Sequence, residues 1–138
     1  GATLYLPVSV EGALLSVGDF HAIMGEGEVA NCGVEIEGRA VLKVDVLPQT
    51  GISWPVLENE RQWITIAYGS SLDEAAQRAV EQMFYFLCRK MGLSETDAGM
   101  LLDMAGDLMI CQIVNPQKTV RMEVPKWLVY AMQERNAS

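Results

Sequence analysis

The sequence predicts an α+β fold in which an antiparallel, β-rich N-terminal part is followed by two helices and a β-hairpin. Two observations support this fold class. Up to about residue 68, apolar residues come in short runs separated by glycines, as in strands and turns. Beyond residue 69 they recur at helical spacing and then return to alternation. We therefore expect a β-rich part, residues 1–68, and an α/β part, residues 69–138, an order typical of α+β proteins.

Several strands are expected in the first part. Apolar runs at residues 4–8 and 13–17 are bounded by turn residues, and residues 62–68 form a third run. In residues 39–47 the polar side chains Arg39, Lys43 and Asp45 alternate with apolar ones. This period of two residues is typical of a half-buried strand.

Two helices are expected next. The first has one apolar face, formed by Leu72, Ala76, Ala79, Val80, Met83, Leu87 and Met91. Ser71 and Glu74 have the spacing of a capping box at its start, and Gly92 follows its end. A second helix is expected to begin after Ser94 and to stop at Gly106.

Residues 108–114 and 119–124 are expected to pair as a hairpin around Asn115-Pro116. Five of the seven methionines in the second part form a series that we expect to fill gaps in the core, because the flexible thioether adapts to irregular space. They are Met83, Met91, Met100, Met104 and Met109.

The composition argues against a nucleic-acid-binding protein and against a membrane-spanning one. Half of the 138 residues are apolar, and 18 acidic residues against 10 basic ones give a formal charge of −8. That charge disfavours a nucleic-acid partner. No apolar run reaches the length of a membrane span, and no signal peptide is evident, so we expect a soluble, cytoplasmic protein. The chain begins at Gly1 inside an apparent strand, which suggests a fragment of a larger structure.

One segment concentrates the residues that carry chemistry. It holds the only histidine, His21, together with Asp19, Glu26, Glu28 and Glu35. If residues 19–21 are extended, Asp19 and His21 lie on the same face, where both can reach one divalent ion. Imidazole with carboxylates suits zinc, which activates water at neutral pH. On spacing alone, a metal site and an ordinary surface cluster of hydrogen-bonded side chains both stay open.

The same segment resembles a known family. Residues 12–29 are similar to the signature GALLSxGDxHAxxGDGEV of the acetamidase/formamidase family, with Glu26 where an aspartate is usual. Later blocks of the family are similar to GVEI at 33–36, ISWP at 52–55, AGDLMICQ at 105–112 and TVRMEVPK at 119–126. The resemblance is to the C-terminal half of the family. It implies that the N-terminal part belongs to a β-sandwich and that the chain is one fragment of a larger two-domain enzyme.

The resemblance also implies a function, the metal-dependent hydrolysis of small linear amides such as formamide and acetamide to a carboxylate and ammonia. We expect Asp19, His21 and Glu26 to hold a divalent metal, zinc by preference, and Glu28 or Glu35 to move the proton to the departing ammonia. A homo-oligomer, or the missing N-terminal half, is expected to complete the site. The alternative is a noncatalytic binding or assembly module that keeps the fold of the amidase.

Overall fold

The computed structural model describes residues 1–48 and 51–137. Its strands and helices follow one another in the order β1 (Thr3–Tyr5), β2 (Val56–Glu58), β3 (Gln62–Gly69), α1 (Leu72–Arg89), α2 (Glu95–Ala105), β4 (Asp107–Gln112), β5 (Lys118–Pro125) and α3 (Lys126–Ala137). No helix among these residues combines the length and the apolar character needed to cross a bilayer.

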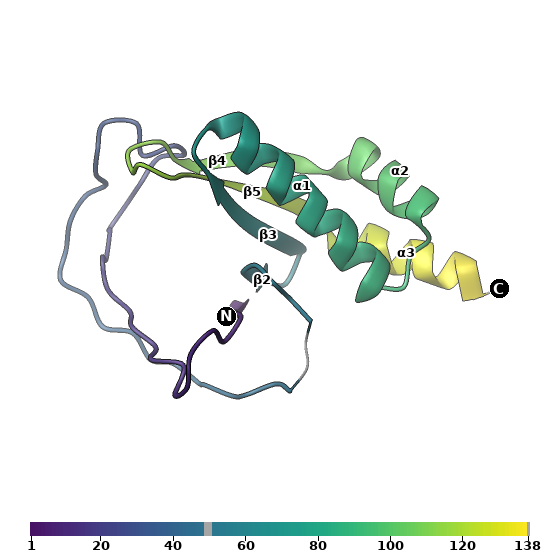
Figure 1. Cartoon of the computed structure of the whole chain (residues 1–138), viewed down its shortest axis with the longest axis horizontal. Helices are drawn as coiled ribbons and strands as arrows, with labels where there is room; N and C mark the ends of the chain where they lie inside the picture. Colours follow the sequence, from purple (N-terminus) through teal and green to yellow (C-terminus); the bar gives the residue numbers. More distant parts are fainter. Residues whose placement is uncertain (49–50, 138) are drawn as a thin grey trace.

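The strands form one antiparallel sheet in the order β1-β2-β3-β5-β4 (Figure 1). Strands β3 and β5 pair along their whole length, from Gln62 opposite Pro125 to Gly69 opposite Lys118. The predicted α+β class, the strand at 62–68 and the C-terminal hairpin are thereby confirmed. The described residues contribute a single sheet, so the second layer of a sandwich is not among them, and the division at residue 68 stays a prediction.

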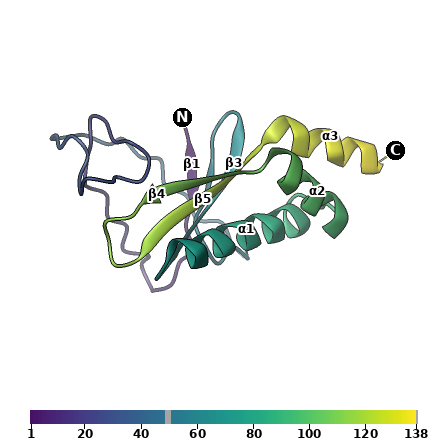
Figure 2. The ribbon, with the colours of Figure 1, turned by 90° about the horizontal axis from the view of Figure 1, so that it is seen from above.

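Helix α1 runs along one face of the sheet, and α2 and α3 lie toward the end that holds the C-terminus (Figure 2). The helix buries a stripe of small and apolar side chains against β3 and β5 because its alanines allow close approach. One polar group inside this layer is satisfied: the Thr65 hydroxyl donates to the carbonyl oxygen of Ala79 at 2.9 Å. The most deeply buried large apolar side chains are Met83, Leu87, Leu101, Val120, Val124 and Val129.

Both predicted helices are confirmed together with their N-terminal caps. The Ser71 hydroxyl accepts from the backbone N–H of Glu74 at 3.2 Å, and the Ser94 hydroxyl accepts from that of Asp97 at 3.1 Å. The capping box is modified, since the Glu74 carboxylate accepts from the Ser70 backbone N–H, one residue earlier than the box requires.

The predicted strands at 13–17 and 39–47 are wrong. Figure 1 shows that the chain leaves the sheet after β1 and returns at β2 by a long, open loop. Ala13 and Leu14 have φ angles of 56° and 52°, which no strand contains. In residues 39–47 the apolar side chains face solvent, with Val41 87% exposed, because no other strand lies beside them to form a ladder.

Two further expectations need correction. Met83 is fully buried, but Met100 and Met104 are exposed, so only part of the methionine series fills the core. Helix α3, which follows Pro125 directly, was not predicted. It buries Val129 and Met132 and leaves Trp127 exposed.

Candidate functional site

Residues 19–36, called the site loop below, fold back on themselves as an irregular hairpin. His21 and Glu35 face each other in an isolated antiparallel bridge. Three backbone hydrogen bonds join the two sides, from Ala22 N–H to Val34 O (2.9 Å), Val34 N–H to Ile23 O (2.9 Å) and Ile36 N–H to Phe20 O (3.1 Å). The hairpin thus brings His21 and Glu35, which are 14 positions apart, next to each other.

Three of the predicted residues converge at this bridge. Nε2 of His21 lies 2.7 Å from Oε1 of Glu35 and 3.6 Å from Oδ1 of Asp19. One ligand atom from each of the three side chains lies within 4.8 Å of the others. Among the described residues, this is the one group of at least three His, Cys, Asp or Glu side chains that is compact enough to share an ion.

The two carboxylates control the protonation of the imidazole. The hydrogen bond with Glu35 raises the pKa of His21 above its ordinary value, against a smaller lowering by burial. The negative charges of Glu35, Asp19 and Glu28 raise the pKa further. Since the His21 side chain is 13% exposed and that of Asp19 is 81% exposed, the ring is held at the base of the group and a carboxylate at its open side.

The structure distributes the other two predicted residues differently. Glu28, with a positive φ of 47°, lies near enough for its charge to act on His21 but outside the group of three. Glu26, which was predicted to hold the metal, pairs instead with Arg121, whose guanidinium lies 2.6 Å away. Glu35, predicted as a proton carrier, takes the place beside His21 that was expected for Glu26.

Two residues that support the site were missed at the level of sequence. Gly33 packs against the His21 ring, because a Cβ at this position would lie 2.8 Å from Cδ2 of the imidazole. Arg121 lies on β5 and holds Glu26. The first has a signal in the sequence, a glycine two residues before a motif glutamate, but that signal does not say which group the glycine contacts.

The donor set fits a divalent ion. One imidazole nitrogen and two carboxylate oxygens are ligands that zinc and related first-row metals accept, and three protein ligands leave a coordination position open. In the absence of an ion, the same atoms stabilise one another through the hydrogen bond between His21 and Glu35. A cation bound here would therefore compete with the proton of that hydrogen bond.

Comparison with known proteins identifies the family to which the chain belongs. The sequence pattern of the Acetamidase/Formamidase family matches residues 1–129 of the chain. The chain belongs to this family. The expectation drawn from the motif in residues 12–29 is thereby confirmed.

Named members of the acetamidase/formamidase family share the sequence and the fold. The acetamidase of Mycolicibacterium smegmatis is 33% identical and the formamidase of Methylophilus methylotrophus 36% identical, each over 90 residues, 56% of this chain and 22% of the relative. A solved acetamidase structure from Bacillus halodurans is 46% identical with a TM-score of 0.89, covering 96% of this chain and 45% of that one. The chain thus spans less than half the length of these relatives.

Proposed function

We propose that the protein containing this chain hydrolyses small linear amides, formamide and acetamide among them, to a carboxylate and ammonia with the help of a divalent metal, zinc by preference. The observation that carries the proposal is the convergence of Asp19, His21 and Glu35 in the site loop of an acetamidase/formamidase chain. The names of the relatives, acetamidase and formamidase, support the class of substrate.

Asp19, His21 and Glu35 would hold the ion. At zinc-to-ligand distances near 2.1 Å, tetrahedral ligand atoms lie about 3.4 Å apart. The 3.6 Å between His21 and Asp19 is close to this value, whereas the 2.7 Å between His21 and Glu35 is that of a hydrogen bond. Binding therefore requires that Nε2 of His21 give up its proton, which Glu35 now shares. When bound, such an ion supplies Lewis-acid activation of a carbonyl group and of water.

The nearby carboxylates are the candidates for the proton transfer that the reaction needs. Hydrolysis of an amide needs a group that takes a proton from water and delivers it to the departing nitrogen. With Glu35 engaged by His21, Glu28 is the predicted proton carrier that stays outside the ligand group. Its position on the same loop, with its charge acting on His21, supports this role.

Metal content by mass spectrometry, measured beside ammonia release from formamide and acetamide, tests the proposal. Glu28→Gln is expected to keep the metal and lose about 100-fold or more in turnover, the usual contribution of a proton carrier. Glu35→Gln is expected to lose metal as well. Glu37→Gln, an exposed carboxylate just beyond the site loop, is the matched control and is expected to change neither.

Two results would overturn the assignment. His21→Ala with full metal content would show that the ion binds elsewhere. Glu28→Gln and Glu35→Gln with undiminished ammonia release would show that neither carboxylate carries the proton. Circular dichroism of each variant distinguishes loss of the fold from loss of metal binding or of ammonia release.

A further inference from the structure

The hydrogen bonds between the site loop and the sheet lie at Glu26 and Gly27. Between residues 6 and 48, Gly27 is the one residue that is buried. It forms an isolated parallel bridge with Gln112 of the edge strand β4, and its carbonyl oxygen accepts from the Ile113 N–H at 3.0 Å. The position of the site loop therefore depends on what holds residues 26 and 27.

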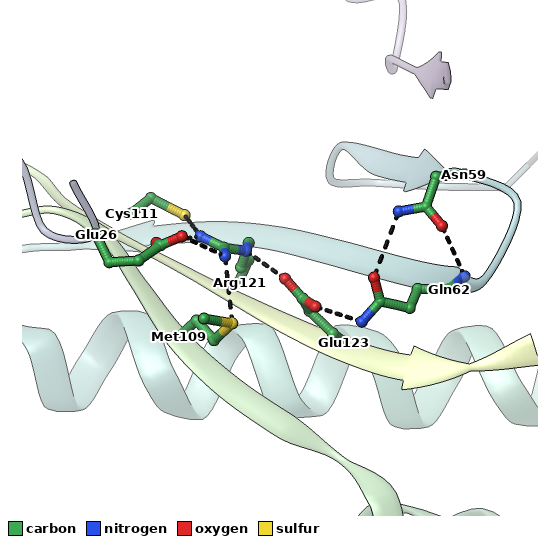
Figure 3. Close-up of polar contacts among 7 residues, drawn as sticks. All are labelled: Glu26, Asn59, Gln62, Met109, Cys111, Arg121 and Glu123. Atoms are coloured by element: carbon green, nitrogen blue, oxygen red, sulfur yellow. Dashed lines mark hydrogen bonds and ion pairs between the residues drawn. The ribbon is translucent and has the colours of Figure 1, made fainter. Parts of the chain in front are cut away.

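Arg121 on β5 binds the residue next to Gly27. Its Nη1 and Nη2 atoms donate to Oε2 and Oε1 of Glu26 at 2.6 and 2.8 Å, so the guanidinium and the carboxylate meet fork to fork (Figure 3). A bidentate pair fixes orientation as well as distance. Hydrogen bonding from Arg121 lowers the pKa of Glu26, which keeps the carboxylate charged.

The rest of the guanidinium is fixed within the sheet. Nε donates to Oε1 of Glu123 at 2.5 Å, Nη2 contacts Sδ of Met109 at 3.2 Å, and Nη1 contacts Sγ of Cys111 at 3.8 Å. All five N–H donors of the arginine thus face an acceptor. Glu123 is itself buried and accepts from Nε2 of Gln62 on β3 at 2.6 Å, so Arg121 joins three strands of the sheet to the site loop (Figure 3).

We infer that Arg121 is a positioning residue for the candidate metal site, which it serves by holding Glu26 and with it the site loop against the sheet. Both carboxylate oxygens of Glu26 are engaged by the guanidinium, so Glu26 acts as the point of attachment and not as a metal ligand. Part of this inference rests on the proposed function, because a positioned site presumes that the ion binds at Asp19, His21 and Glu35.

The physical reason is that the site loop has no core of its own. A segment with few buried apolar contacts opens at low free-energy cost unless specific contacts restrain it. His21 and Glu26 are only five positions apart in the sequence, so movement at the attachment would displace the candidate ligands. Metal sites tolerate displacements of about 0.5 Å, and loss of a supporting contact lowers metal affinity about 10- to 100-fold.

The test uses Glu26→Gln, Arg121→Met and the double variant, with Arg39→Met as a matched control at an exposed arginine outside the site loop. Glu26→Gln leaves the pairing of Arg121 with Glu123 in place, so it keeps the test valid if Arg121→Met fails to fold. Two quantities are measured on each protein: hydrogen exchange of the backbone amides that close the loop, and affinity for Co²⁺ followed by its visible absorption.

We expect both single variants to speed exchange at Ala22, Val34 and Ile36 about tenfold or more and to weaken Co²⁺ binding about 10- to 100-fold. The double variant should bind Co²⁺ no more weakly than Arg121→Met alone, because the contact with Glu26 is already lost in that variant. Arg39→Met should match the wild type.

The outcomes separate the inference from the proposed function. Exchange rates and Co²⁺ affinity both within twofold of the wild type would overturn the inference, and so would faster exchange with unchanged affinity. If the wild type binds no Co²⁺ while both single variants speed exchange, the attachment by Arg121 stands and the proposed metal site fails.

Discussion

Replacing Gly33 with alanine tests whether the site loop must hold the imidazole of His21 in one position. A Cβ at residue 33 would lie 2.8 Å from Cδ2 of His21 and 2.8 Å from the carbonyl oxygen of Ile23, whereas ordinary contact begins at 3.4 Å. The ring and the backbone must therefore separate by about 0.6 Å. Because this exceeds the tolerance of roughly 0.5 Å for a metal site, we expect zinc affinity to fall about 10- to 100-fold.

Gly25→Ala is the matched control, because a Cβ at residue 25 meets nothing within 4 Å. Zinc affinity of both variants is measured by competition with a chromophoric chelator at pH 7. The site loop lies outside the hydrophobic core, so both melting temperatures should stay within about 2 °C of the wild type. Equal zinc affinity in the two variants would refute the argument that Gly33 is needed to seat the ring.

Two further predictions concern stability. Burial raises the pKa of Glu58, but hydrogen bonds from Lys126 and Tyr5 outweigh it and hold the pKa below its ordinary value of 4.5. A lowered folded-state pKa adds stability above pH 4.5 that is lost as the pH falls, so Glu58→Gln should lower the melting temperature at pH 7 and much less at pH 3. Met83→Ala should cost about 2–5 kcal/mol in chemical denaturation, whereas Met104→Ala, at an exposed site, should cost less than about 0.5 kcal/mol.

Each of these predictions has a clear contrary result. A difference between Glu58→Gln and the wild type that persists unchanged at pH 3 would mean that the ion pair with Lys126 is not the source of the stability. Equal losses for the two methionine variants would mean that burial in the structure does not decide the cost of truncation.

Local patterns predicted the parts of the fold that local interactions determine. Helices α1 and α2 could be found because their apolar faces and their caps, Ser71 and Ser94, lie within a few residues of the backbone groups they serve. Alternation in residues 39–47 misled for the opposite reason. Alternation shows that a strand at these residues would have one apolar face to bury. It does not show whether another strand lies beside them to form a sheet.

The candidate site could be predicted only in part. Asp19 and His21 are two residues apart, so their proximity follows from spacing alone. The meeting of His21 with Glu35, 14 residues later, depends on the turn between them, and that of Glu26 with Arg121, 95 residues later, depends on the whole sheet. Contacts at such separations set the geometry of the candidate ligands, yet they leave no periodic trace in the sequence.

Because His21 is the only histidine in this chain, its ring can report directly on the candidate site. With one histidine in 138 residues, every ring signal in a histidine-labelled sample comes from between Asp19 and Glu35. A histidine-directed acylating reagent would likewise modify only His21. The rate of that acylation would report whether Nε2 is free, protonated or bound to an ion. Binding of an ion at this site can therefore be followed in this chain without a mutation, tag or dye.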